Sequence, residues 1–189
     1  KHLQEITILN VSDWHAQLTP LAETADTVTS AGAVNPAFAI AGALTAGTYF
    51  DRDTRLEVEI RDLADTLYRR ADWNWACDGG PTLTHGWRPE TGFIQHRWQG
   101  YDEGLLLYIL GLGSPTHPLP PESYRAYCST YQWKEIYGRE LLYSGPLFTH
   151  QLSHLWVDFR GIRDAFMRQR GSDYFENSRQ ATFVQQEYA

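Results

Sequence analysis

The sequence predicts an all-α domain of paired helices, with a short N-terminal strand and linker in front of it. After residue 36, segments with helical signals alternate with loops rich in Gly and Pro, and no segment there has a convincing strand pattern. The 189 residues, 42% hydrophobic and 21% charged, have the composition of a globular protein. This length suits one domain or a piece of a larger one, in which the helices pack on one another.

Residues 1–36 differ in character from the rest of the chain. Ile6 to Val11 is a short β-branched run that predicts a strand, and residues 22–35 are small and polar, which indicates a linker. The opening residues lack the apolar stretch and cleavage pattern of a signal peptide. The longest apolar run, Leu105 to Leu112, is far below the roughly 18–20 residues of a membrane span. We therefore expect a soluble chain without membrane insertion, its targeting segment removed if it had one.

Two helices are expected between residues 36 and 71. Asn35 can cap the first of them, because Pro36 then occupies the first helical position, where proline is favoured. The second is the clearest helix of the chain, with apolar residues at spacings of four, three, four and four. These residues are Leu56, Ile60, Leu63, Leu67 and Ala71.

The rest of the chain reads as a long loop followed by shorter helices. Residues 73–100 have few helix signals, and so long an irregular segment in a compact domain is more often functional than idle. Four further helices are expected, over residues 101–112, over 121–138 with Gly138 as terminator, shortly before Gly161, and from Ser172 or Asp173 onward. The last has no stop signal before Ala189, so we expect the domain to continue beyond the chain.

Charge and aromatic content limit the kinds of ligand. The net charge of −7 argues against nucleic acid or an anionic membrane as a partner, because both require basic patches. Seven Trp and eleven Tyr exceed what a core of this size needs, and many stand beside Gly, Pro, Asp or Arg. Such residues either pack in the ordinary way or line a groove for flat ligands such as sugar rings. Cys77 and Cys128 have no metal-like spacing and are either two buried thiols or one disulfide.

The segment RWQGYDEGLLLYILGL, residues 97–112, contains the strongest candidates for catalysis. Asp102 and Glu103 share helical stripes with leucines, so we expect them in an enclosed place, where a carboxylate is paired, hydrogen-bonded or protonated. A raised pKa beside Trp and Tyr suits a general acid in glycosyl chemistry. The alternative is that these acids, like Glu176, only favour the helix dipole, by about 0.3–1 kcal/mol each. Gly104 inside a helix costs about 1 kcal/mol and needs a reason such as close approach of a ligand.

Two histidine-containing patterns are weaker candidates. Asp13 and His15 follow the predicted strand, and ITILNVSDWHAQLTPL resembles the opening strand of 5′-nucleotidase-type metallophosphoesterases, in which these two positions would bind metal. The later Gly-Asn-His motif of those enzymes is missing, and a dinuclear site needs several more ligands. His150 and His154 lie four apart, as in zinc proteases, but Gln151 stands where those enzymes need a glutamate. We therefore expect no metal and no other cofactor, and keep a metal-dependent phosphohydrolase as a lesser alternative.

Four long motifs, in this order and spacing, resemble the glycoamylase-like domain family: GWRPETGF, RWQGYDEGLLLYILGLGSPTHPLP, PLFTHQLSHLWVDFRG and DYFENSRQAT. That family includes bacterial β-1,2-glucanases, and the cyclising domain of cyclic β-1,2-glucan synthases is related to it. The resemblance covers residues 37–189 and implies an (α/α)6 toroid with a sugar-binding cleft at one end. Twelve helices do not fit into this length, so about half of the toroid is expected. The predicted division is therefore an N-terminal strand and linker, 1–36, and a C-terminally truncated glycoamylase-like domain, 37–189.

The resemblance also implies a site. Glu103 and Glu176 match the acidic residues implicated in catalysis, and Asp102, the neighbour of Glu103, is the third catalytic candidate. The residues expected to line the cleft and bind substrate are Trp87, Trp98, Tyr101, His154, Trp156, Asp158 and Arg160.

The implied activity is that of a glycoside hydrolase or transglycosylase on a β-linked glucan, with β-1,2-glucan first. One carboxyl group would protonate the glycosidic oxygen, and the other would activate water or attack the anomeric carbon. Because the toroid is incomplete, the alternative is a carbohydrate-binding remnant without activity. The expected partner is an oligo- or polysaccharide, the expected location is periplasmic or extracellular, and the sequence leaves the oligomeric state open.

Overall fold

The computed structural model describes residues 37–189, and the side chains of residues 39–189. The strand predicted at Ile6 to Val11, the linker after it, and Asp13 and His15 lie outside the described residues. The boundary predicted at residue 36 stays a prediction.

The described part of the chain is mostly helical, as predicted. Its α-helices are α2 (Ala37–Tyr49), α3 (Arg55–Arg70), α4 (Leu105–Leu112), α5 (Pro121–Ser129), α6 (Leu147–Gln151), α7 (Ala165–Gln169) and α8 (Tyr174–Tyr188). The 3-10 helices are η2 (Trp75–Cys77) and η3 (Leu152–Leu155). Two antiparallel hairpins pair β1 (Trp87–Arg88) with β2 (Gly92–Phe93) and β3 (Trp133–Ile136) with β4 (Arg139–Leu142). None of the described helices is long and apolar enough to cross a membrane.

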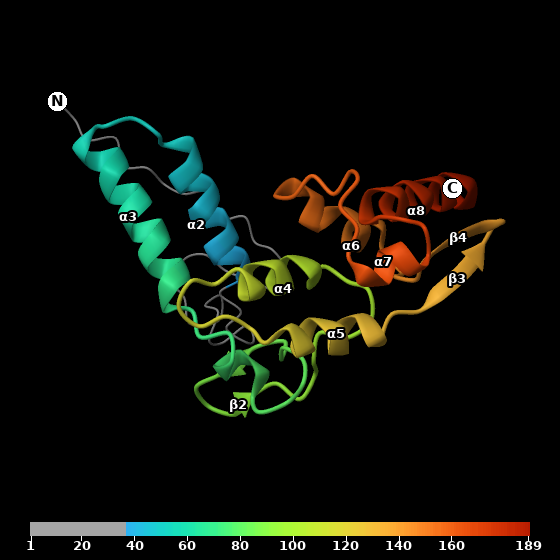
Figure 1. Ribbon diagram of the computed structural model, residues 1–189, viewed down its shortest axis with the longest axis horizontal. Coiled ribbons are helices and arrows are strands. Elements are labelled where there is room, and N and C mark those ends of the chain that lie inside the picture. Colours follow the sequence, from blue (N-terminus) through green and yellow to red (C-terminus); the bar gives the residue numbers. More distant parts are fainter. Residues whose placement is uncertain (1–36) are drawn as a thin grey trace.

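The helices form two groups joined by a central layer. The pair α2 and α3 stands on one side, α6, α7, α8 and the β3–β4 hairpin stand on the other, and α4 and α5 lie between and below them (Figure 1). The central helix α4 forms the middle of the core, with Leu105, Leu106 and Leu107 each 2% exposed and Tyr108 fully buried. Burying a leucine side chain stabilises a fold by about 1.5–3 kcal/mol, so this short helix contributes strongly.

The pair α2 and α3 does not use the apolar stripe of α3 as its contact surface. Thr54 caps α3 by accepting a hydrogen bond from the Glu57 N–H, as N-cap residues do. The helices approach closely where Gly47 lies against Ala64, since a Cβ at Gly47 would be 3.3 Å from the Ala64 Cβ. The stripe residues Leu63 and Leu67 are instead 57% and 52% exposed. The spacing of apolar residues therefore predicted helix α3 correctly, but the apolar side of α3 faces away from α2.

The long segment between α3 and α4 is irregular, as predicted, but it is well anchored. The Arg97 guanidinium donates hydrogen bonds to the carbonyl oxygens of Cys77 and Thr82, at 2.7 and 2.6 Å. A β-bridge between Thr84 and Arg97 closes the two ends of this loop onto each other. The cysteines are resolved as two buried free thiols, Cys77 and Cys128, and not as a disulfide.

The prediction of one helix over residues 121–138 is wrong at its C-terminal half, and so is the absence of strands after residue 36. Helix α5 ends at Ser129, and residues 133–142 form the β3–β4 hairpin. Tyr137 and Gly138 both have positive φ, 49° and 68°, which is what a two-residue hairpin turn of the favoured type requires. Gly138 therefore reverses the chain inside a hairpin and does not end a helix.

We expect Gly138→Ala to lower the free energy of unfolding by about 1–2 kcal/mol, because a residue with a Cβ is strained in the left-handed region. Urea denaturation checks this. Gly145→Ala is the matched control, since a Cβ there would meet no atom within 4 Å and Gly145 is not at positive φ. Equal effects of the two substitutions would contradict the assignment of strain to Gly138.

Candidate active site

The two candidate acids lie in a turn just before α4, and not inside the helix as expected. Asp102 Oδ1 accepts hydrogen bonds from the Tyr127 hydroxyl at 2.7 Å and from the Gly104 N–H at 2.9 Å. A Cβ at Gly104 would be 2.7 Å from that same oxygen and 3.0 Å from a carbon of the Trp98 ring. Packing of the turn therefore accounts for this glycine, without the close approach of a ligand.

This turn holds a carboxyl group that titrates near neutral pH. Burial raises the pKa of Asp102 from 3.8 to about 7, although the hydrogen bonds from Tyr127 and Gly104 lower it. The charge of Glu103 raises it further, by a smaller amount. Glu103 itself is only 5% exposed, so the second carboxyl group of the turn is also shielded from water. Asp102 therefore holds a proton near neutral pH, as a general acid must.

A pair of stacked tyrosines joins this turn to the start of α8. The rings of Tyr101 and Tyr174 lie nearly parallel, 10° apart in orientation, with their centroids separated by 5.9 Å. Both side chains are buried, with 4% and 2% exposed. Each tyrosine is followed two residues later by a candidate acid, Glu103 in one case and Glu176 in the other. The stack therefore places two Tyr-x-Glu segments, one at the N-terminus of each helix, beside each other.

His150 of α6 and Asn177 of α8 connect the same junction to the β3–β4 hairpin. The Asn177 amide lies 3.2 Å from His150 Nδ1, and its oxygen accepts a hydrogen bond from the Leu142 N–H at 2.7 Å. The His150 ring contacts Tyr101 with a centroid distance of 5.2 Å. Burial lowers the pKa of His150, so this histidine is neutral and serves the packing of the junction. Among residues 39–189, no three His, Cys, Asp or Glu side chains gather closely enough to hold a metal ion.

Glu176 occupies a different environment in the first turn of α8. Its N–H donates to Asp173, the N-cap, at 2.8 Å. Its carboxylate accepts two hydrogen bonds from Arg179, both at 2.8 Å, and another from Gln180. The Arg179 guanidinium lowers the pKa of Glu176. These contacts all run along α8 itself, so Glu176 is held ionised, and its partnership with Glu103 stays a prediction.

Of the residues predicted to line a cleft, two are buried in the core. Trp98 is 2% exposed and stacks on His85, with ring centroids 4.3 Å apart. Tyr101 is 4% exposed and belongs to the stack described above. Both side chains therefore pack against the turn that carries Asp102 and Glu103, which we call the acidic turn.

Four others, His154, Trp156, Asp158 and Arg160, lie in or just after η3, and three of them form a group with Phe175 at the start of α8. Arg160 donates to the Asp158 carboxylate through Nε and Nη2, at 2.8 and 2.5 Å, which lowers the pKa of Asp158 to about 2. The Arg160 guanidinium lies 6.0 Å from the centre of the Phe175 ring, and His154 lies 6.4 Å from the same ring. Burial lowers the pKa of His154, which favours its neutral form. This group combines an ion pair, a neutral imidazole and the aromatic ring of Phe175, the residue that precedes Glu176 in the chain.

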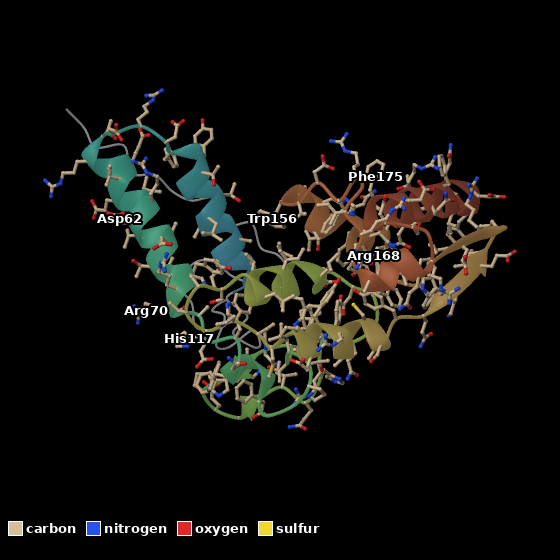
Figure 2. All side chains as sticks on the ribbon, viewed as in Figure 1. Asp62, Arg70, His117, Trp156, Arg168 and Phe175 are labelled. Atoms are coloured by element: carbon tan, nitrogen blue, oxygen red, sulfur yellow. The ribbon has the colours of Figure 1, made fainter. Side chains whose placement is uncertain are left out.

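The fourth, Trp156, faces the opposite helix pair. Its indole N–H donates to the Thr45 hydroxyl of α2 at 2.9 Å. In Figure 2, Trp156 lies on the segment nearest α2, and Phe175 lies at the N-terminal end of α8. The seventh residue, Trp87, lies apart from the others on β1, in the wall of a separate cavity.

Sequence reasoning missed Tyr127 and Phe175. Tyr127 is fully buried and holds Asp102, and Phe175 is 41% exposed between Tyr174 and Glu176. The high density of tyrosine over residues 124–131 was the signal that could have indicated Tyr127. For Phe175, the signal was its place inside the motif DYFENS.

The chain is similar to proteins described as glucoamylases and to hydrolases of β-1,2-linked glucans. A family model described as "Putative glucoamylase" matches residues 95–189, half of the chain. A relative from Parabacteroides distasonis, an exo β-1,2-glucooligosaccharide sophorohydrolase (non-reducing end), is 27% identical over 183 residues. That alignment includes 82% of this chain but only 25% of the relative.

Solved structures resemble the chain over most of its length. A structure described as a putative glucoamylase from Bacteroides fragilis is 29% identical, with a TM-score of 0.72. The endo-β-1,2-glucanase from Chitinophaga pinensis is 25% identical, also with a TM-score of 0.72. Each match covers 90% of this chain and 42% of the solved chain. The chain therefore spans about two-fifths of the length of these structures.

We expect the free energy of unfolding to depend on pH through Asp102. Its pKa is about 7 in the folded protein and ordinarily 3.8, so between about pH 4 and 7 the folded state binds more protons than the unfolded state. Stability contributed by this group is therefore full below about pH 4, falls as the pH rises through this window, and is constant above it. Asp102→Asn removes this dependence while keeping an oxygen acceptor for Tyr127.

Urea denaturation at several pH values between 4 and 8 measures the effect. Asp62→Asn, on the exposed side of α3, is the control and should leave the slope unchanged. A wild-type slope retained in Asp102→Asn would show that Asp102 titrates normally in the folded protein.

Proposed function

The chain belongs to the glycoamylase family, and on this premise we propose that it is a glycoside hydrolase or transglycosylase acting on a β-linked glucan, with β-1,2-glucan as the first candidate. The names of the similar proteins support this substrate, since one is a β-1,2-glucooligosaccharide hydrolase and another an endo-β-1,2-glucanase. The single observation that carries the proposal is the stack of Tyr101 on Tyr174, which joins the helix ends bearing Glu103 and Glu176.

The two acids have complementary surroundings for the two roles in this chemistry. Glu103, buried beside a carboxyl group that titrates near pH 7, is the proposed general acid that protonates the glycosidic oxygen. Glu176, with its pKa lowered by Arg179, is the proposed ionised partner. It would attack the anomeric carbon in a retaining enzyme, where the carboxyl groups are about 5–5.5 Å apart. It would activate water in an inverting enzyme, where they are about 6.5–9.5 Å apart.

The remaining residues of the site suit a neutral, hydroxyl-rich ligand. Phe175 offers an exposed ring for stacking, and the Asp158–Arg160 pair offers both acceptors and donors to sugar hydroxyls. Asp102 is proposed to support Glu103 by holding the turn through Tyr127. We place the protein in the periplasm or outside the cell, where a polymeric glucan would be met.

A second candidate function is carbohydrate binding without hydrolysis. The observations that favour it are the exposed Phe175 ring and the Asp158–Arg160 pair, which can contact a sugar without any proton transfer. Nothing in the described part of the chain favours the metal-dependent phosphohydrolase proposed from Asp13 and His15.

We expect Glu103→Gln and Glu176→Gln each to reduce hydrolysis of β-1,2-gluco-oligosaccharides by at least about 100-fold, since each removes a proton-transfer or nucleophilic group. Chromatography of the released sugars, on a panel of differently linked β-glucans, measures this. Glu187→Gln, exposed near the end of α8, is the control. Glucan binding without any released sugar, unchanged by Glu103→Gln, would establish the non-catalytic alternative instead.

We expect Arg179→Leu to shift the acidic limb of the pH–rate profile to higher pH. Arg179 lowers the pKa of Glu176, so its removal raises that pKa, and an ionised Glu176 is then lost at a higher pH as the solution is acidified. Arg125→Leu, a change of another exposed arginine that pairs with a glutamate three residues away on its own helix, should leave the profile in place. An acidic limb that does not move in Arg179→Leu would remove Glu176 from the role of ionised partner.

A further inference from the structure

A cavity of about 300 Å³ lies between the end of α3, the η2 helix and the β1–β2 hairpin, away from the acidic turn. We propose that this cavity is a second sugar-binding site, which takes one glucosyl ring of a longer β-glucan. The proposal rests on the proposed function, because it takes the glucan as the ligand. Four aromatic residues of its wall are Trp73, Trp75, Trp87 and Phe93.

The aromatic wall is open to solvent. Trp75 is 53% exposed, which is unusual for the largest apolar side chain. Its ring lies 4.6 Å from Phe93 and 5.9 Å from Trp87, tilted by 54° and 57°, so the three rings form the sides of a hollow and not a closed stack. Exposed aromatic faces beside a hollow are what the carbon face of a sugar ring packs against.

The wall is held in place before any ligand binds. The Asp72 carboxylate accepts a hydrogen bond from the Trp75 N–H at 2.9 Å, which fixes the start of η2. The carbonyl of Ala76 accepts hydrogen bonds from both the N–H and the hydroxyl of Thr84, at 3.0 and 2.9 Å. Thr84 leads into the β1–β2 hairpin, so the two segments that carry the aromatic rings are tied to each other. Such preorganisation lowers the entropic cost of binding.

The polar groups of the cavity suit a neutral ligand rich in hydroxyls. Arg70 and Asp72 both line it and are exposed, so one donor and one acceptor of opposite charge stand at its rim. Figure 2 shows Arg70 at the end of α3 next to this loop.

The cavity and the acidic turn both lie beside helix α4. Leu107 lines the cavity, and a Cβ at Gly111 would be 3.2 Å from Trp73, so the cavity follows the later part of α4. Glu103 lies before the start of the same helix. The turn contributes no residue to the cavity, so we assign the two places to different glucosyl units of one glucan.

The test compares Trp75→Ala with Phe148→Ala, a substitution of another exposed aromatic residue that does not line the cavity. Calorimetry would measure binding of a long β-1,2-glucan, and product analysis would measure turnover of a β-1,2-linked trisaccharide. We expect Trp75→Ala to weaken binding of the long glucan about tenfold, as loss of one stacking contact of about 1.4 kcal/mol would. Turnover of the trisaccharide should stay unchanged, Trp75→Phe should restore most of the affinity, and Phe148→Ala should change neither.

The other outcomes are distinguishable. Unchanged affinity of Trp75→Ala for the long glucan, in a protein whose hydrolysis is abolished by Glu103→Gln, would overturn the second site and leave the proposed function standing. Loss of trisaccharide turnover in Trp75→Ala, with an unchanged thermal unfolding midpoint, would assign Trp75 to the cleft and also overturn the proposal. A wild-type protein that neither binds nor cleaves any β-glucan would overturn both.

Discussion

Helix α4 has almost no side exposed to water, and this burial governs the arrangement of the elements around it. Every polar group at its two ends needs a partner within the protein, because an unpaired buried group costs about 1–3 kcal/mol. At the C-terminal end, the carbonyl of Leu110 accepts from the Tyr68 hydroxyl of α3, and the carbonyl of Gly111 accepts from the Leu119 N–H. At the N-terminal end, the partners are Tyr127 and the turn itself. These hydrogen bonds hold α3, α5 and the acidic turn against α4.

The candidate acids at the starts of α4 and α8 differ because their surroundings differ. Asp102 and Glu103 belong to the enclosed end of α4, where burial favours the protonated form of Asp102. Glu176 lies at the partly exposed start of α8, where an arginine on the same helix favours the charged form. Sites for acid–base chemistry commonly place one proton-holding and one charged carboxyl group close together. In this chain, the buried pair Tyr101 and Tyr174 is the physical link between the two environments.

Local signals predicted the elements whose formation depends on neighbours in sequence. The caps and periodicity of α3 and the apolar run of α4 predicted both helices, because these features act within a few residues. The β3–β4 hairpin was missed because residues 121–129 are a true helix and its pattern was extended across the turn at Tyr137. The exposure of the α3 stripe could not be predicted either, since periodicity shows that a helix has an apolar side but not what covers it.

The sequence motifs supplied the candidate acids, whose catalytic roles stay a prediction, but they could not supply the geometry around them. The burial of Trp98 and Tyr101, the Tyr101–Tyr174 stack and the contact of Tyr127 with Asp102 depend on tertiary contacts between distant segments. The sequence also left two uses open for the excess of aromatic residues, packing or stacking on ligands. The structure shows the first use for the central tyrosines, and the exposed Trp75 cluster is the place where the second use is proposed.

The tyrosines of this core differ from phenylalanine in that their hydroxyl groups donate hydrogen bonds to partly buried acids. Asp164, the N-cap of α7, accepts hydrogen bonds from the hydroxyls of Tyr124 and Tyr174, at 2.5 and 2.6 Å. Tyr174 stacks on Tyr101, which adjoins Asp102, whose carboxyl group accepts from Tyr127. The starts of α7, α8 and α4 are therefore connected through one series of acids and tyrosines. Because the members share partners, removing a hydroxyl at the Asp164 end should affect the acidic turn more than its distance suggests.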